Sequence, residues 1–184
     1  MSDLFLMTLY KEPQFDMGGA PTLSFPDALF PAWKLAYLRG GRSGRDTAVT
    51  LSMSDWGGHH HYDSLNLTYW KDGQELLSDL GYLADSPSAH MTTRSVAHNL
   101  VVVDEMNQQT QGRGGSVQLF HPLGRLKVME GASNAYHTTS LYRRFVAQVE
   151  HPGENSYVFD VFRVAGGGTH DLVYKFYRIQ CIIK

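Results

Sequence analysis

From Trp33 onward, apolar and polar positions follow the pattern of β-strands. Apolar and polar residues alternate over short runs, and turn-forming residues separate the runs at regular spacing. The expected strands are 34–39, 48–53, 64–70, 74–80, 99–104, 116–120, 126–130, 142–151, 156–164 and 171–177. About ten short strands without a long helix-period segment predict an all-β protein, a large antiparallel β-sandwich.

The clearest turn in this pattern is Asp72-Gly73, between the runs 64–70 and 74–80. Asp-Gly between two alternating runs is a strong signal for a two-residue hairpin turn. In such a turn Lys71 faces Gln74, and the same register sets Asp79 opposite Asn66.

The first residues differ from the rest. Residues 1–31 carry frequent prolines and glycines, so we expect an irregular or briefly helical segment there and a sandwich domain over 32–184. The start of the chain lacks the basic flank and cleavage site of a signal peptide. No apolar run approaches the roughly 20 residues that span a bilayer, so no membrane partner is expected.

The composition argues against nucleic-acid binding and excludes an internal disulfide. The formal net charge is −2 and the pI is about 6.5, so the basic surface typical of nucleic-acid binding is missing. The single cysteine, Cys181, excludes an internal disulfide. Six arginines are candidates for contact with an acidic polymer, but most of them are expected to serve solubility at exposed turns and strand edges: Arg39, Arg42, Arg45, Arg143, Arg144 and Arg163.

The histidines suggest a metal site. His59 and His61 are separated by one residue, which in a strand points both imidazoles to the same side. Asp79 lies 18 residues after His61, and His98 lies 19 residues after Asp79. Two histidines and a carboxylate with an open fourth position form a known zinc-ligand set. The competing interpretation is a solvated histidine loop.

The hairpin register argues against a simple version of this site. If Asp79 faces Asn66, a regular hairpin leaves His61 five positions further along its strand. His61 and Asp79 can share a metal only if the HHHYD segment is irregular, which the preceding Gly57-Gly58 pair allows.

Two long segments resemble a known family. HHHYDSLNLTYWKDGQELLSDLGY and TRSVAHNLVVVDEMNQ are similar to the C-terminal part of the heparinase II/III-like polysaccharide lyases. The segments YRRFVAQVEHPGENSYVFDVFRVAGGGTHDL and FPDALFPAWKLAYLRGG resemble the same family. The resemblance covers roughly residues 25–177, nearly the whole chain.

The resemblance implies roles for individual residues. It implies a zinc bound by His61, Asp79 and His98, and a place for His59 in the substrate cleft as a catalytic acid or base. We expect Asp63 and Asn99 to hold the ligands in place, with plain loop hydrogen bonding as the competing interpretation. Tyr82 and Arg94 are further candidates for substrate contact, although a tyrosine at a strand end commonly serves packing.

The resemblance also implies a reaction. Lyases of this family cleave acidic, uronate-containing polysaccharides by β-elimination, so the expected partner is a glycosaminoglycan or alginate, met in the periplasm, at the cell envelope or outside the cell. Family members carry an N-terminal helical toroid that supplies further catalytic groups. This chain begins at the sheet domain, so we expect a fragment with little or no activity alone. The alternative is a stand-alone, zinc-stabilised carbohydrate-binding module without catalysis.

Overall fold

The computed structural model describes residues 26–42, 45–54, 60–81, 89–109, 111–151, 156–176 and 179–183. Most of these residues lie in strands, and all strand pairs are antiparallel. The predicted all-β sandwich is therefore confirmed.

The strands form three sheets. The five-stranded sheet has the order β1 (Ala28–Phe30), β2 (Leu35–Arg42), β3 (Arg45–Ser52), β4 (Asn66–Lys71), β5 (Gln74–Leu77). The four-stranded sheet has the order β10 (Ser156–Gly166), β9 (Thr139–Glu150), β8 (Leu126–Ser133), β7 (Gly115–His121). The three-stranded sheet has the order β12 (Ile179–Ile183), β11 (His170–Phe176), β6 (Val101–Val103). Three single helical turns complete the described elements: η1 (Pro31–Trp33), α2 (Ala89–Thr92) and η2 (Ser95–Ala97).

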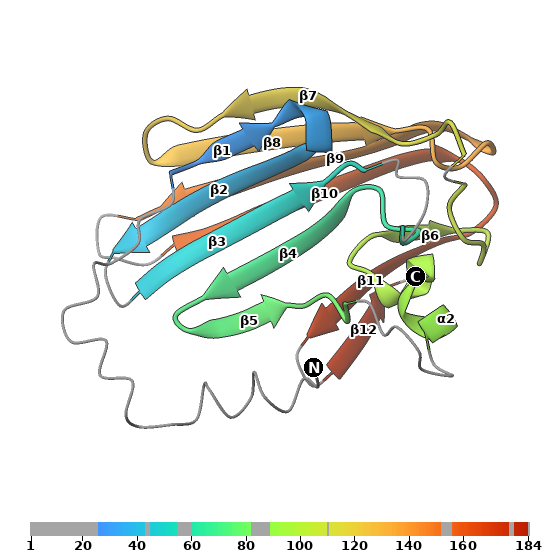
Figure 1. Ribbon diagram of the computed structural model, residues 1–184, viewed down its shortest axis with the longest axis horizontal. Coiled ribbons are helices and arrows are strands. Elements are labelled where there is room, and N and C mark those ends of the chain that lie inside the picture. The colour runs from blue at the N-terminus through green and yellow to red at the C-terminus, as the bar shows by residue number, and fades with distance from the viewer. Residues whose placement is uncertain are drawn as a thin grey trace, which may run out of the picture.

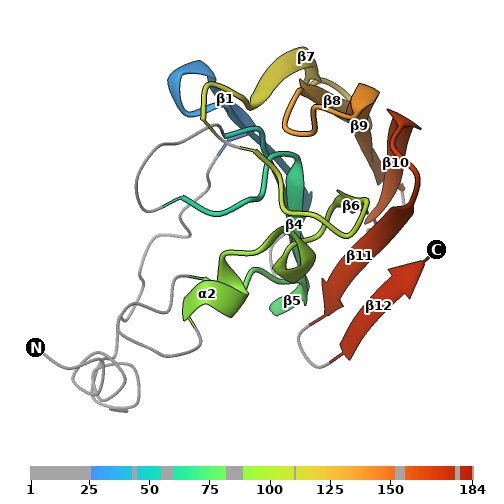
Figure 2. The same cartoon turned by 90° about the vertical axis from the view of Figure 1, so that its right-hand side faces the viewer.

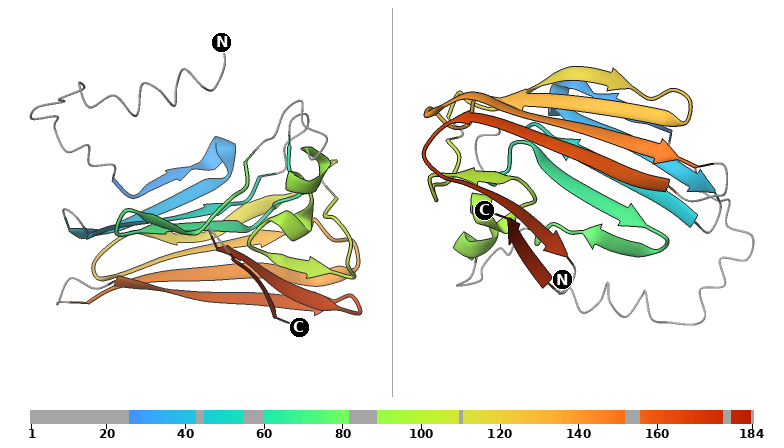
Figure 3. Two further views of the ribbon diagram at one scale, coloured as in Figure 1. Left: turned by 90° about the horizontal axis from the view of Figure 1, so that it is seen from below. Right: turned by 180° about the vertical axis from the view of Figure 1, so that it is seen from behind.

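The five-stranded and four-stranded sheets stack as two layers (Figure 1; Figure 3, left). The core between them is built from inward-facing positions of both sheets: Leu38, Val49, Leu51, Leu67, Met129, Tyr142 and Val146. The three-stranded sheet lies beside β5 (Figure 2), and the Ser78 N–H donates to the Lys175 carbonyl over 2.9 Å. The segments that carry the candidate ligands meet at this junction.

Two glycines let the layers approach closely at the start of β4. A Cβ added to Gly131 would lie 2.7 Å from Met53 Sδ and 2.8 Å from Leu65 Cδ2, and one added to Gly115 would lie 2.6 Å from Met53 Cβ. Such distances are shorter than carbon contacts at their optimum separation of about 3.5 Å. The absent side chains therefore leave the space that Met53 and Leu65 fill.

The predicted Asp72-Gly73 hairpin is present. Both turn residues have positive φ, 51° and 78°, as a type I′ turn requires, and Lys71 pairs with Gln74. The register then shifts by one residue, because Trp70 pairs with Glu75 while Tyr69 pairs with Leu77. The β4–β5 ladder continues past this irregularity by one pair and stops at Leu77, two residues before Asp79.

All ten expected strands appear, with shifted ends, and two further strands were not predicted. β1 falls in the segment 1–31, and its three residues pair with Tyr37, Ala36 and Leu35 of β2. β12 continues the chain beyond the last expected strand and pairs with β11. The helix expected near the N-terminus lies outside the described residues. Within the part of the chain that is described, no helix has the length and apolar character needed to cross a membrane.

Candidate metal centre

Three separate segments bring His61, Asp79 and His98 together. His61 precedes β4, Asp79 follows β5, and His98 lies between η2 and β6. One ligand atom from each side chain lies within 4.8 Å of the other two. His60 to Asp63 form no regular strand, as the hairpin register required. The structure thus assembles the residue set that the sequence singled out.

A tight turn after Asp63 reverses the chain and makes this meeting possible. The Asn66 N–H donates to the Asp63 carbonyl over 2.8 Å, and the Leu65 N–H donates to the Ser52 carbonyl over 2.7 Å. Leu65 has a φ of 69°, which is strained for a branched side chain, but the side chain is fully buried in the core. Core packing of Leu65 therefore holds the irregular segment in place.

Hydrogen bonds to Thr93 and Ser95, around the end of α2 and the start of η2, also hold the irregular segment. The Tyr62 N–H donates to the Thr93 carbonyl over 2.9 Å, and the Ser95 hydroxyl donates to the Tyr62 carbonyl over 2.8 Å. These two bonds attach the residue after His61 to the stretch that leads to His98.

The donor set fits a divalent ion such as zinc. His98 is fully buried, and its Nδ1 donates to Asp79 Oδ2 over 3.0 Å. Its Nε2 is buried and has no hydrogen-bond partner among the described residues, which is costly for a polar atom unless a ligand satisfies it. The imidazoles of His61 and His98 lie 5.1 Å apart between ring centroids. Imidazole and carboxylate are both good zinc ligands.

Burial and neighbouring charges favour the protonation states that bind a metal, which are a neutral His61 and an ionised Asp79. Burial lowers the pKa of His61, and the positive charge of a protonated His98 would lower it further, so the neutral imidazole is favoured. Burial alone would raise the pKa of Asp79, but the hydrogen bond and charge of His98 hold it below its ordinary value. Burial raises the pKa of Asp63, against the opposing effect of His98.

Two asparagines join the ligand-bearing segments. Asn66 donates through Nδ2 to Asp79 Oδ2 over 2.8 Å and accepts the Asn99 N–H at Oδ1 over 2.9 Å. Asn99 donates through Nδ2 to the Ser78 carbonyl over 2.8 Å. Asn99, expected beside the ligands, therefore braces the backbone on both sides of the site. Asn66 was not proposed as a site residue, although the hairpin register had placed it opposite Asp79.

Arg144 is the second residue that the sequence did not assign to the site. Its side chain is fully buried and pairs with Asp160 through two hydrogen bonds of 2.9 and 2.6 Å. Its Nη1 also donates to the Leu65 carbonyl over 2.8 Å and to the Asn99 carbonyl. The expectation of an exposed arginine is wrong here: strand alternation places Arg144 on the core side of β9, between Tyr142 and Val146.

The remaining expected site residues are His59, Tyr82, Arg94 and Asp63. His59 and Tyr82 lie outside the described residues. Arg94 is exposed, immediately before η2, and Asp63 is half-buried beside the turn that precedes β4. Their proposed roles stay predictions.

Gln108 was also missed, and no sequence signal pointed to it. It is buried, accepts the Ser64 N–H at Oε1 over 2.7 Å and donates through Nε2 to the Ser64 carbonyl over 2.9 Å. It thereby fixes the turn after Asp63 from the opposite side.

The fold has close counterparts among solved structures. The heparinase III product of gene BT4657 has a TM-score of 0.71 and 20% sequence identity, over 85% of this chain and 25% of that chain. Heparan sulfate lyase HepC from Pedobacter heparinus has a TM-score of 0.70 and 15% identity, over 85% of this chain and 25% of that chain. The chain therefore spans about a quarter of the length of these structures, and at these identities the likeness shows the fold. No curated protein sequence matches the chain.

The antiparallel sandwich shares its fold with part of these heparinase and heparan sulfate lyase structures. The sequence matches the family described as Heparinase II/III-like, C-terminal, over residues 22–181. The chain is therefore a member of this family.

Proposed function

We propose that this chain is the metal-stabilised sheet domain of a lyase that cleaves acidic, uronate-containing polysaccharide by β-elimination. The observation that carries the proposal is the convergence of His61, Asp79 and His98 from three segments in a sandwich of this family. One of the three donors, His61, belongs to the histidine run that contains His59. A metal ion that holds His61 would therefore also restrict the backbone at His59, the proposed acid or base two residues earlier.

The reaction demands accurate placement of such a group. β-Elimination removes the weakly acidic proton beside the sugar carboxylate and protonates the departing oxygen, so the acid and base must lie within about 3 Å of the moving protons. An imidazole serves either role near neutral pH, which suits His59. Arg94 and Tyr82 are proposed to contact the acidic substrate, where a guanidinium stabilises the carboxylate as charge develops.

His61, Asp79 and His98 would hold a zinc ion, and Asp63 and Asn99 would support them. When bound, the ion supplies rigidity by fixing the orientation of both imidazoles. The chain's own residues already prepare this arrangement: Asn66 and His98 orient the Asp79 carboxylate, and Tyr62 is tied to Thr93 and Ser95.

The solved structures point to the polymer class. One of them is named a heparan sulfate lyase, and we propose a glycosaminoglycan or alginate as the substrate of the whole protein. Because such polymers lie outside the cytoplasm, we propose a periplasmic, cell-envelope or secreted location. Further catalytic groups would come from a helical domain of the kind that the family resemblance implies.

Exposed aromatic side chains support the second candidate function, a carbohydrate-binding module. Trp33 is 62% exposed and Phe159 is 57% exposed, and aromatic faces of this kind bind sugar rings. A carbohydrate-binding module without catalysis would use them without any need for His59.

Metal analysis of the purified chain tests the proposal. We expect one zinc per chain, and a fall in the melting temperature after chelation. His61→Ala should lose both effects, whereas His121→Ala, an exposed histidine on β7, should retain both. Absence of zinc, together with an unchanged melting temperature in His61→Ala, would contradict the ligand set.

A lyase assay separates the two candidate functions. In the protein that contains the helical domain, the ultraviolet absorbance of the unsaturated product should appear with acidic polysaccharide and be lost in His59→Ala. Zinc binding with normal polysaccharide affinity but no unsaturated product would favour the binding module.

A further inference from the structure

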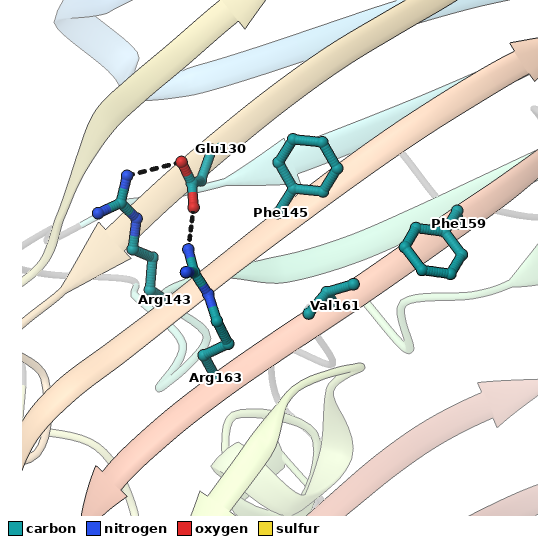
Figure 4. A pocket seen from close by; sticks show the side chains of 6 residues that line it. All are labelled: Glu130, Arg143, Phe145, Phe159, Val161 and Arg163. Carbon is teal, nitrogen blue, oxygen red and sulfur yellow. Dashed lines mark hydrogen bonds and ion pairs between the residues drawn. The ribbon is translucent and has the colours of Figure 1, made fainter.

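The outward face of the four-stranded sheet carries a second cluster of charged and aromatic side chains. This outer face consists of the positions that alternate with the core residues of β8, β9 and β10: 126, 128, 130, 132, 141, 143, 145, 147, 149, 157, 159, 161, 163 and 165. A pocket of about 540 Å³ lies on it, lined by Glu130, Arg143, Phe145, Phe159, Val161 and Arg163 (Figure 4). We call it the Arg143–Arg163 pocket.

The strand register creates an excess of positive charge in this pocket. Arg143 of β9 lies directly opposite Arg163 of β10, and like charges in directly opposed positions destabilise a strand pair. Both guanidiniums converge on Glu130 (Figure 4): Arg143 Nη2 donates to Oε2 over 2.6 Å, and Arg163 Nη2 donates to Oε1. Among the outer-face positions Glu130 is the only acid, so one carboxylate faces two guanidiniums.

The hydrogen bonding of the cluster is incomplete. The Glu130 side chain is only 9% exposed and the Arg163 side chain 49% exposed, so the carboxylate lies underneath and a guanidinium faces solvent. Arg143 Nε is buried and has no hydrogen-bond partner in the described part of the chain. A guanidinium has five donors in a planar fork that suits a carboxylate or sulfate. The remaining positive charge therefore favours an anion from solution.

The rest of the pocket is apolar. Phe145, Val161 and the largely exposed Phe159 lie along the strands beside the arginines, on the same face (Figure 4). A ligand that matches both parts has an anionic group next to a flat surface of C–H bonds. An acidic sugar unit has both features, since its carboxylate or sulfate projects from a ring whose C–H face packs on aromatic side chains.

We propose that the Arg143–Arg163 pocket binds a carboxylate- or sulfate-bearing sugar unit of an acidic polysaccharide. The pocket is separate from the candidate metal centre, because Arg144, which contacts the segments of that centre, points to the opposite face of β9. The pocket holds polymer and performs no chemistry. The ligand class rests on the proposed function, whereas the charge excess and the apolar wall are properties of this face alone.

Calorimetric titration of the 184-residue chain with two defined probes tests the proposal. A heparan sulfate hexasaccharide carries sulfate and carboxylate groups, and an alginate hexasaccharide carries carboxylates only. We expect the chain to bind at least one probe, and the difference between the two shows which anion the pocket prefers. Arg163→Gln should weaken this binding about tenfold, the loss of one charge-assisted contact pair.

Two further variants make the test specific. Glu130→Gln removes the competing carboxylate and leaves both guanidiniums, so it should strengthen binding, the opposite sign from Arg163→Gln. Phe159→Ala removes an exposed ring without touching the core and should weaken binding severalfold. Arg125→Gln, an exposed arginine outside the pocket, is the matched charge control and should change little.

Several results would contradict the proposal that this pocket binds a sugar unit. These are no binding of either probe by the wild-type chain, equal losses in Arg163→Gln and Arg125→Gln, or weaker binding in Glu130→Gln. Self-association of the chain that Phe159→Ala abolishes, without saccharide binding, would instead show a protein interface. Zinc content measured on the same samples is independent of these results, so failure of the pocket and failure of the metal centre are distinguishable.

Discussion

Arg143 and Arg144 are neighbours in sequence and differ in almost everything else. Arg144 is fully buried, its charge is balanced by Asp160, and it donates to the Leu65 and Asn99 carbonyls beside the candidate metal centre. Arg143 points outward and shares Glu130 with Arg163. Because successive side chains of a strand point to opposite faces, β9 carries one arginine for structure and one for the surface.

The difference between the two faces lies in the balance of charge. On the inner face, burial alone would lower the pKa of Arg144, but the charge and hydrogen bonds of Asp160 raise it above its ordinary value. The ring of Phe162 lies 5.2 Å from the guanidinium and adds a cation–π contact. On the outer face, two guanidiniums share one carboxylate. A balanced buried pair indicates a structural role, whereas an unbalanced exposed cluster indicates a ligand.

The largest expected effect comes from removing the charge that balances Arg144. Asp160→Asn leaves a buried guanidinium without its counter-ion, which typically costs about 3–5 kcal/mol. It also removes a charged acceptor from the Tyr174 hydroxyl, which donates to Asp160 Oδ2 over 2.8 Å. Urea denaturation measures the loss.

The matched control for Asp160→Asn is Glu130→Gln, which makes the same chemical change on the outer face. Its expected cost is about 1 kcal/mol or less, because the Arg143 and Arg163 side chains are 34% and 49% exposed and keep contact with water when Glu130 loses its charge. Equal losses in the two variants would show that the two faces do not differ in the way described.

The next effect concerns the brace between the ligand segments. Asn66→Ala removes both the donor to Asp79 and the acceptor for the Asn99 N–H. Loss of such a supporting residue typically lowers metal affinity about 10–100-fold, which competition with a chromogenic chelator measures. Asn134→Ala is the control, since the exposed Asn134 side chain accepts a hydrogen bond from the Gly114 N–H. A similar fall in zinc affinity for Asn134→Ala would contradict a specific role for Asn66.

The strands were predictable because their signals are local. Alternation and the Asp72-Gly73 turn each depend on a few adjacent residues, and the structure contains every strand that they predicted. β1 was missed because three residues between prolines carry no alternation, and its strand conformation comes from pairing with β2. The strand conformation of β12 likewise comes from pairing with β11.

The site was predictable in part, for the same reason. The histidines and Asp79 belong to recognisable segments. A regular hairpin cannot bring His61 to Asp79, so the sequence predicted an irregular backbone before β4, and the structure has one. Gln108 and Arg144 act through contacts with residues 44 and 79 positions away, which no local pattern encodes. Alternation in β9 does not identify Arg144 as buried, because the opposite face, with Phe145 and Ala147, is at least as apolar. Arginine is also rarely buried, which favoured an exposed position.

A smaller effect is expected from alkaline pH, which acts mainly on the inner region. Burial raises the pKa of the Tyr136 hydroxyl, which donates to the Met106 carbonyl, to about 12. In the unfolded chain a tyrosine ionises near pH 10. Between these values the folded state retains the proton, so stability is complete below about pH 10 and declines as the pH rises toward 12. The slope is at most about 1.4 kcal/mol per pH unit for each such tyrosine.

Urea denaturation at a series of pH values between 9 and 12 measures this slope. Tyr136→Phe should reduce it, whereas Tyr157→Phe, which removes an exposed hydroxyl on the outer face, should leave it unchanged. An unchanged slope in Tyr136→Phe would show that this hydroxyl is accessible to solvent in the folded protein.

The smallest expected change in stability is that of Arg143→Gln, and it completes the comparison within β9. The substitution leaves Glu130 paired with Arg163 and removes a like-charge pair from directly opposed positions, so a gain and a loss nearly cancel. We expect the free energy of unfolding to change by less than about 0.5 kcal/mol, as at most surface positions. The same substitution one residue later, Arg144→Gln, leaves Asp160 without its buried counter-ion and should be as damaging as Asp160→Asn. If Arg143→Gln instead destabilised the chain by several kcal/mol, the guanidinium would be a structural element of the sheet. The positive charge on the outer face would then need no ligand to explain it.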